Sequence, residues 1–490
     1  MAIKKEPSEK GTTKVTFDID KSGDFPEWYE EIVKVAGIVD NRYPVKGMIV
    51  WKPYGYKALK LMLRIMETLL DKYGHQEAYF PMLIPESIFK KESDFLEGFG
   101  GDSYIVTQVG NTKLTEKLYI RPTSETVMYE MFKLWIRSKS DLPLKLYQTV
   151  NIFRYETKQS KAILRVREIV KFKEAHTCHA TMEGADRQIE EGIQIYREFF
   201  DSLLIPYIVL RTPKWDTFAG AEYNYDLLTV MPDGKAIELG SIINLGNKYA
   251  EVFDIKYEKE DGSYEHVYQT CYGISERALA VAFSIHGDTR GAIFPPCIAP
   301  VQVVIVPIIF KGKEASTLEK CVDVKKRLEE RGFRVKIDDS ARGPGDKFYH
   351  WETKGVPIRV EIGPRDLEKN RVVVARRDTF KKTRVEDEKM VEVIGKTNEM
   401  IDEELRCRAE KYLAARIVYF KGLDDFKKDY SERVGIIALP WCGDDACGVE
   451  LEKAVDIPAL GYVPDEPIDE KCPMCGSTDN VRWLYFGRTY

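Results

Sequence analysis

Residues 151–177 read NIFRYETKQSKAILRVREIVKFKEAHT, and the fold of the larger part of the chain depends on them. The stretch is predicted to form a strand (NIFRYE), a charged loop (TKQSKA) and a second strand (ILRVREIVKFK). Because alternate residues of a strand share a face, Arg154 and Glu156 would point the same way, and Arg165 and Arg167 would do so on the second strand. Arginines held in place by glutamates suit bidentate contact with phosphate. The alternative is a solvated hairpin, whose surface ion pairs are each worth only about 0–1 kcal/mol.

A second segment, LYIRPTSETVMYEMF at 118–132, places polar residues at the start of a predicted helix. A strand ends at Pro122, and Thr123, Ser124 and Glu125 then open the helix. A carboxylate beside two hydroxyls can receive a ligand ammonium group. An ordinary helix cap is the alternative, because serine and threonine are common there.

The third segment is TCYGISERALAVAFSIHGDTRGAIFPP at 270–296, in which a strand ends at Gly273 and Ser275, Glu276 and Arg277 begin a helix. A helix N-terminus beside an arginine is a phosphate site. The usual nucleotide signatures, G-x-G-x-x-G and the P-loop, are missing from the sequence. Any nucleotide site must therefore use other elements.

The chain of 490 residues is long enough for about two to four domains. Residues 1–297 mix amphipathic helices with strands that follow one another closely, which favours an α+β unit built on an antiparallel sheet. In 298–400, the buried strand VQVVIVPI, a helix over 314–331 and further strands predict an α/β unit. A charged helix over 386–416 leads into 401–490, predicted to be a small zinc-containing α/β domain.

Charge and hydropathy exclude several classes of protein. The formal net charge of -5 argues against a surface that coats nucleic acid, although basic residues cluster locally, as in RRDTFKKTR at 376–384. The N-terminal sequence lacks the apolar core of a signal peptide, and the longest apolar run, VQVVIVPIIF, is too short to span a bilayer. The sequence therefore predicts a cytoplasmic protein without a membrane segment.

The nine cysteines divide into five single residues and two close pairs. The single residues are expected to be small buried apolar side chains in a reducing compartment. The pairs lie in PWCGDDACG and KCPMCGS, with glycine or proline beside each pair to make tight turns. This spacing predicts a structural zinc ion held by four thiolates, with no open coordination position. The predicted ligands are Cys442, Cys447, Cys472 and Cys475.

Taken together, the segments resemble the signature motifs of class II aminoacyl-tRNA synthetases. The motifs are RPTSET, FRYE with LRVRE, FKEAHT, GISER and HGDTRG with its following PP, in that order. With the APVQVVIVPI opening of the middle unit, the resemblance covers nearly the whole chain and is to the archaeal and eukaryote-like prolyl-tRNA synthetases of class IIa. It implies a six-stranded antiparallel catalytic fold, an anticodon-binding domain and a homodimer. It also implies a C-terminal tyrosine, here Tyr490, that docks towards the catalytic domain.

The resemblance further implies a proline–tRNA ligase, with ATP, L-proline and tRNA(Pro) as substrates and Mg²⁺ as cofactor. Arg154 and Arg277 would be the catalytic residues, Arg154 on the α-phosphate and Arg277 on the outer phosphates. The implied ATP-binding residues are Arg154, Glu156, Arg165, Ile169, Glu238, Ser241 and Arg277. The implied proline-binding residues are Thr123, Glu125, Arg154, Phe172, Glu174 and His176. The implied anticodon-reading residues are Lys347, Glu352, Lys354, Arg359 and Glu361.

Two of these assignments keep a simpler alternative. Taken alone, His176 would be a core residue or an outer partner of the site, and the anticodon segment would be an ordinary amphipathic helix over a sheet. The chain also departs from the family pattern in two places. Ile169 stands where an aromatic residue usually stacks on adenine, and Ser241, Ile242 and Ile243 replace a usual Thr-Ser-His. Loss of that histidine bears on how the pocket rejects alanine and cysteine.

Two other functions fit parts of the sequence. A class II synthetase for another small amino acid would differ in the pocket residues Thr123, Glu125, Phe172 and His176 and not in the ATP motifs. An inactive relative that binds RNA would have no need of Arg154, Glu156 and Arg277, so their presence argues against it.

Overall fold

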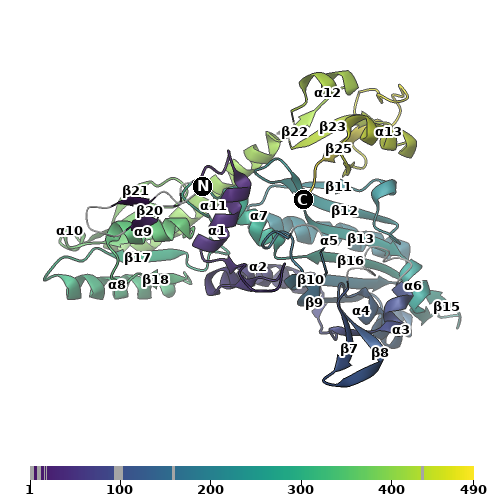
Figure 1. The fold of residues 1–490 in the computed structure, drawn as a ribbon, viewed down its shortest axis with the longest axis horizontal. Helices are drawn as coiled ribbons and strands as arrows, with labels where there is room; N and C mark the ends of the chain where they lie inside the picture. Colours follow the sequence, from purple (N-terminus) through teal and green to yellow (C-terminus); the bar gives the residue numbers. More distant parts are fainter. Residues whose placement is uncertain are drawn as a thin grey trace.

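A long, mostly antiparallel sheet joins the first and last parts of the chain in the computed structural model (Figure 1). The structure describes residues 5–7, 13–15, 17, 19–92, 103–156, 160–431 and 435–490. Within them, the strand order of this sheet is β22-β23-β25-β24-β11-β12-β13-β16-β10-β9-β5. The strands from the first part of the chain are β5 (Gln76–Glu77), β9 (Leu144–Phe153), β10 (Glu168–His179), β11 (Ile208–Arg211), β12 (Tyr223–Val230), β13 (Ala236–Gly246) and β16 (Tyr268–Ile274).

The strands β11-β12-β13-β16-β10-β9 pair antiparallel throughout, as the resemblance implies. Alternate side chains enter two different cores because the side-chain period of a strand is two. On β9, Tyr147 packs into the larger core with α2 and α5, whereas Leu146 packs into a second core with α4 and α6. The helices of this unit are α1 (Phe25–Val35), α2 (Pro53–Lys72), α3 (Glu86–Phe89), α4 (Glu125–Trp135), α5 (Met182–Ser202), α6 (Lys248–Phe253) and α7 (Arg277–His286).

Smaller strand pairs surround this sheet. A three-stranded sheet has the order β6-β8-β7, and the other pairs are β1-β2, β3-β4 and β14-β15. Their bounds are β1 (Lys5–Pro7), β2 (Thr13–Val15), β3 (Val39–Asp40), β4 (Val50–Trp51), β6 (Leu83–Pro85), β7 (Ile105–Val109), β8 (Thr112–Ile120), β14 (Lys256–Glu258) and β15 (Tyr264–His266). In the part of the chain that the structure describes, no helix has the length and apolar character needed to cross a membrane.

The middle unit is a separate mixed sheet of order β18-β17-β19-β20-β21, drawn in green in Figure 1. The α/β prediction is confirmed, since β17 pairs parallel with both β18 and β19 and helices cover the sheet. The strands are β17 (Val303–Pro307), β18 (Val335–Ile337), β19 (Ile358–Ile362), β20 (Arg371–Arg376) and β21 (Lys382–Glu386). The helices are α8 (Glu314–Glu329), α9 (Pro344–Thr353), α10 (Pro364–Leu367) and α11 (Met390–Ala414).

Helix α11 links the middle unit to the rest of the molecule. Its residues Ile394 and Ile401 pack into the core of the middle unit, whereas Leu413 packs with Leu210 and Leu460 beside the long sheet. The boundary predicted between residues 400 and 401 therefore falls within one continuous helix.

The C-terminal unit, drawn in yellow, extends the long sheet. Strand β24 pairs antiparallel with β11 through Arg211 and Tyr462, which makes the two units one sheet. Helix α13 also packs against the first unit: a Cβ atom at Gly448 would overlap the ring of Trp215, so only glycine fits this contact. The elements are β22 (Ile417–Tyr419), α12 (Leu423–Asp429), β23 (Ile436–Trp441), α13 (Asp445–Val455), β24 (Ala459–Tyr462) and β25 (Arg482–Gly487).

The predicted strands in 151–177 are too long. The first was expected to include Glu156, and the second was expected to begin with ILRVRE. Strand β9 ends at Phe153 and β10 begins at Glu168, so Arg154, Glu156, Arg165 and Arg167 lie on the connecting loop. Residues 157–159 of that loop lie outside the described residues.

Burial explains why this apolar segment is not a strand. Ile163 and Leu164 are buried in the larger core, and Ile163 has a positive φ of 66°. The hydroxyl of Tyr29 on α1 donates to the carbonyl of Ala162 at 2.7 Å. The loop therefore folds back onto α1 and buries its apolar residues there.

Candidate functional site

A buried polar pocket forms where α4 begins beside β10. Phe172, Glu174 and His176, which the family resemblance groups together, alternate along β10 and so share one face of the strand. The hydroxyl of Thr123 donates to the carboxylate of Glu125 and, at 3.2 Å, to Glu174 Oε1. Residues far apart in the sequence thus meet around two carboxylates.

Two further residues complete this pocket: Ser124, which the sequence already placed beside Glu125, and Gln148, which sequence reasoning missed. Ser124 donates to the Glu174 carboxylate and accepts a hydrogen bond from Gln148 Nε2 at 2.7 Å. Gln148 lies directly opposite Glu174 on β9, and its Oε1 accepts from the backbone N–H of Phe80 at 3.1 Å. The only sequence signal was that a buried glutamine on a strand needs polar partners.

The electrostatics of the pocket favour a cation. Burial, with the nearby charge of Glu125, raises the pKa of Glu174 to about 7, even though Ser124 and Arg154 act in the opposite direction. Two carboxylates that share a buried site repel each other when both are ionised. A bound ammonium group would relieve that repulsion.

Arg154 stands at the edge of this pocket and is half-buried. Its Nε donates to the carbonyl of Pro122 at 3.0 Å, and its guanidinium lies 5.8 Å from the centroid of the Phe172 ring. Burial lowers the pKa of Arg154 and so does Arg277, while Glu174 and Glu125 raise it. The charges of the two carboxylates and of Arg277 thus all act on Arg154, and two guanidinium groups can share the charge of one anion.

Arg277 opens α7, as the GISER segment predicts. Its guanidinium donates to the carbonyl of Glu238 at 3.2 Å, and its backbone N–H donates to Ser275 Oγ at 3.2 Å. Nearby on β13, Ser241 Oγ donates to Asp226 at 2.5 Å. Burial and the charge of Glu238 raise the pKa of Asp226 to about 7. Acidic groups thus lie beside the arginine.

The remaining predicted ATP residues surround the loop between β9 and β10. Glu156 is half-buried and its backbone N–H donates to the carbonyl of Arg154 at 2.8 Å. Arg165 is half-buried on the turn that follows. Ile169 pairs with Ile152 of β9 just before a bulge in β10.

The buried carboxylate of Glu276, to which sequence reasoning gave no role, fixes that bulge. Lys171 has a positive φ of 63°, and the backbone N–H of Val170 donates to Glu276 Oε1 at 3.3 Å. Burial raises the pKa of Glu276 to about 8. Glu276 therefore ties β10 to the start of α7, the helix that Arg277 opens.

In the middle unit, three of the predicted residues form one ion-pair network. Arg359 contacts Glu352 at 2.7 Å and Glu361 at 3.0 Å, and Lys382 contacts Glu361 at 2.7 Å. The Arg359 guanidinium also lies 4.1 Å from the centroid of the Phe348 ring. The network combines donors, acceptors and a planar ring.

The other two predicted residues have different partners. Lys347 is buried and donates to the carbonyl of Asp338 at 2.8 Å. Lys354 donates to the carbonyl of Ala36 at 3.1 Å and lies 4.2 Å from the Tyr54 ring. Lys354 lines a cavity of about 560 Å³ between α2 and the middle unit. The five residues thus do not make a single cluster.

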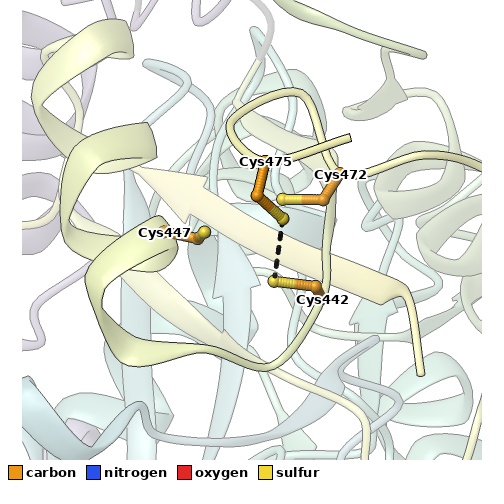
Figure 2. A group of neighbouring side chains, drawn as sticks. All are labelled: Cys442, Cys447, Cys472 and Cys475. Atoms are coloured by element: carbon orange, nitrogen blue, oxygen red, sulfur yellow. Dashed lines mark hydrogen bonds between the residues drawn. The ribbon is translucent and has the colours of Figure 1, made fainter. Parts of the chain in front are cut away.

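The four paired cysteines meet in the C-terminal unit, as predicted (Figure 2). Their Sγ atoms all lie within 4.8 Å of one another, and those of Cys442 and Cys475 are 3.7 Å apart. Four sulfurs at about 2.3 Å from a tetrahedral zinc ion lie about 3.8 Å from one another, so the geometry fits the metal.

The local backbone positions Cys447 and lowers the pKa of Cys472. Asp444 caps α13 by accepting from the backbone N–H of Cys447 at 3.1 Å. Burial raises the pKa of Cys442 and Cys447, as expected for crowded thiols, whereas hydrogen bonds from backbone N–H groups outweigh burial at Cys472 and lower its pKa. A bound cation would favour the thiolate form of all four.

The C-terminal residue reaches the first unit, as the family resemblance implies. The hydroxyl of Tyr490 donates to Asp233 at 2.8 Å, and its ring lies 5.1 Å from Lys161 Nζ. Lys161 belongs to the loop between β9 and β10. The last residue of the chain is therefore in contact with the loop that carries Arg165.

Comparison with protein families divides the chain in the same way as the structure. A model described as the tRNA synthetase class II core domain (G, H, P, S and T) matches residues 104–286. A model of the anticodon binding domain matches residues 302–397, and one of the prolyl-tRNA synthetase C-terminal region matches residues 423–490.

Similar proteins match over nearly their whole length. A proline–tRNA ligase of Pyrococcus abyssi is 45% identical over 96% of the chain and 98% of that protein. One of Methanococcoides burtonii is 47% identical over 95% of the chain and 97% of that protein. A solved structure of Giardia lamblia prolyl-tRNA synthetase in complex with prolyl-adenylate has a TM-score of 0.93 at 37% identity, covering 97% of the chain and 100% of the other.

Proposed function

The chain belongs to the proline–tRNA ligases, a family of class II aminoacyl-tRNA synthetases, and we propose that it activates L-proline with ATP and transfers it to the 3′ end of tRNA(Pro). The observation that carries this proposal is the pairing of the cation-seeking pocket of Glu125 and Glu174 with Arg154 beside it. The two carboxylates suit the ammonium group of an amino acid, and the Arg154 guanidinium suits its carboxylate and a phosphate.

The first step joins two anions. A carboxylate oxygen of proline attacks the α-phosphorus of ATP, and the bond to pyrophosphate breaks. Arg154 and Arg277 offset the negative charge that builds up on the phosphates, Arg154 at the α-phosphate and Arg277 at the outer phosphates. Such catalysis works by positioning and electrostatics and needs no enzyme nucleophile.

Proline occupies the pocket itself. Thr123 and Glu125 receive its ammonium, and Phe172, Glu174 and His176 complete the walls. Gly273 supports this role, because a Cβ atom there would lie only 2.8 Å from Cζ of Phe172 and would displace the ring. The pocket depends on that ring staying in place.

Proline binding is expected to weaken as the pH falls. Glu174 has a pKa of about 7, so it loses its negative charge below that pH and attracts the ammonium less. Between about pH 8 and pH 6 the KM for L-proline should rise by up to about tenfold, since the ionised fraction of a carboxyl group with a pKa of about 7 falls about tenfold between these two pH values. Pyrophosphate exchange measured across this range tests it.

The control is Glu174→Gln, which keeps the shape of the side chain but cannot ionise. Its KM for L-proline should be high and almost independent of pH over the same range. A wild-type KM that stays flat from pH 8 to pH 6 would show that Glu174 does not titrate in the free enzyme.

The rest of the proposed ATP site is made by the loop between β9 and β10, by the start of β10 and by β13. Glu156 accepts from the adenine edge, Ile169 makes an apolar contact with the base, and Arg165 contacts the outer phosphates. Glu238 and Ser241 lie on the phosphate side. Glu238 and the neighbouring Asp226 are the carboxylates that would hold Mg²⁺, which offsets phosphate charge when bound.

In the second step, a ribose hydroxyl at the 3′ end of tRNA attacks the carbonyl carbon of prolyl-adenylate, and AMP leaves. The middle unit reads the anticodon, with Glu352, Arg359 and Glu361 on base edges. Splayed single-stranded bases are recognised by such donors and acceptors and by stacking on planar side chains. Lys347, held by the Asp338 carbonyl, and Lys354, at the cavity beside α2, lie apart from this network and would offer separate cationic contacts to the tRNA.

We further propose that the four-cysteine cluster holds one structural zinc ion and that the enzyme works in the cytoplasm as a homodimer. The zinc assignment is supported by the sulfur geometry. The dimer and the compartment follow from the family resemblance. Sedimentation of the purified protein at micromolar concentration tests the dimer.

The activity is tested by ATP–pyrophosphate exchange with each of the twenty amino acids in the absence of tRNA. Proline is expected to drive exchange well above alanine and cysteine, because the Phe172 ring can pack against the pyrrolidine ring that alanine and cysteine lack. Faster exchange with another small amino acid would assign a different substrate. ATP binding without exchange would favour the RNA-binding relative.

A further inference from the structure

A second group of metal-ligand residues lies outside the four-cysteine cluster. One ligand atom each from Glu125, His176 and Cys271 lie within 4.8 Å of one another. All three side chains are buried, with exposures of 7%, 1% and 5%. They come from three different elements, α4, β10 and β16.

The fold places these residues together through the register of the sheet. His176 and Cys271 are direct partners on the antiparallel strands β10 and β16, so their Cβ atoms are about 4.5–5.5 Å apart on one face. Glu125 is the first residue of α4 and reaches the same face from above. The convergence is therefore built by strand pairing and by the helix start.

An outer partner orients the histidine. Tyr129 lies one helical turn after Glu125, and its hydroxyl is 3.1 Å from His176 Nδ1. A hydrogen bond at one ring nitrogen leaves the other nitrogen available to a metal, which is the usual arrangement around metal-bound histidine.

The chemistry of the three ligands selects the ion. A carboxylate, an imidazole and a thiolate together suit zinc, whereas Mg²⁺ and Ca²⁺ prefer oxygen ligands alone. Three protein ligands leave a fourth position open, unlike the closed four-cysteine site. We propose that Glu125, His176 and Cys271 form a second, open zinc site, and that zinc bound there competes with L-proline.

The competition follows from the shared carboxylate and rests on the proposed function. Glu125 cannot receive the ammonium of proline while it ligates a cation. Binding of zinc releases the thiol proton of Cys271 to solvent, because the thiolate is the ligand. On the far side of Cys271, its partner on β13 is Ile243, which offers no ligand atom. Ile243→His would supply a fourth one.

The first test counts zinc on the full-length protein. After equilibrium dialysis against excess zinc, the wild type should hold two ions per chain, and a weak chelator should remove only one. Cys271→Ser should hold one. Cys407→Ser, a matched change at an exposed cysteine on α11, should hold two. One ion in the wild type, or two in a folded Cys271→Ser, overturns the site.

Ile243→His provides a test that does not depend on the folding of Cys271→Ser. It should tighten the removable ion by at least about tenfold, because an added ligand should contribute at least as much as an outer partner of a metal site, whose loss typically costs about 10–100-fold. An unchanged affinity in this variant contradicts the site.

A competition experiment distinguishes the zinc site from the proposed aminoacylation function. Added L-proline should weaken binding of the removable ion, while L-alanine should do so much less. If two ions bind and proline has no effect, the competition is wrong and the metal site stands. If proline fails to drive pyrophosphate exchange, the proposed function fails, while the zinc count still decides the site.

Discussion

Replacing Arg154 with alanine is expected to lower proline-dependent ATP–pyrophosphate exchange by about a thousandfold or more. Losing one preorganised donor to developing charge typically reduces the rate by about 10²–10³, and arginines on transferred phosphoryl groups can contribute more. Arg154 is held by the Pro122 carbonyl at 3.0 Å and lies next to Arg277, Glu125 and Glu174. Its loss removes the only one of these groups that we assign to both proline and the α-phosphate.

The measurement is steady-state exchange with saturating ATP and proline, together with a thermal melt to show that the variant is folded. Arg154→Lys should recover only part of the activity, because lysine keeps the charge but loses the planar fork. Arg331→Ala, at an exposed position of the middle unit, should exchange at the wild-type rate. If folded Arg154→Ala keeps more than about a tenth of the activity, adenylate forms elsewhere.

Features with a local cause could be predicted from the sequence. The alternation of Phe172, Glu174 and His176 puts them on one face of β10 whatever the strand pairs with. The helix start after Pro122 and the turns around the cysteine pairs are local as well. For this reason the four-cysteine cluster could be predicted from the spacing alone, whereas the proline-binding role of Phe172, Glu174 and His176 was implied by the family resemblance and stays a prediction.

Features that depend on distant partners could not be predicted. Ile163 and Leu164 read as part of a strand, but α1, more than a hundred residues earlier in the chain, buries them in a loop. Gln148 and Glu276 are ordinary residues until the fold brings Phe80, Ser124 and Val170 to them. The pairing of Arg211 with Tyr462 joins two units that the sequence separates.

Replacing Cys472 with serine is expected to release the structural zinc and unfold the C-terminal unit. A structural zinc site contributes about 10 kcal/mol or more of apparent folding free energy, and this unit has only a small core of its own. The Cys472 thiol is also the one whose pKa the backbone lowers, so serine removes the best-prepared ligand. Zinc content should fall from about one tightly held ion per chain to almost none.

Unfolding of the C-terminal unit should also remove two sets of contacts that stabilise the first unit. Strand β24 would leave β11 with an unpaired edge, and Tyr490 would lose its contacts with Asp233 and Lys161. Limited proteolysis should then cut after α11 and leave a stable fragment that contains α1 to α11, with weaker ATP-dependent exchange because the Lys161 loop has lost its support. Cys407→Ser, which lies outside the cluster, should keep both its zinc and its resistance to protease. A Cys472→Ser protein that keeps the tightly held ion, or that loses it and still resists protease, would mean that the C-terminal unit is stable without four thiolate ligands.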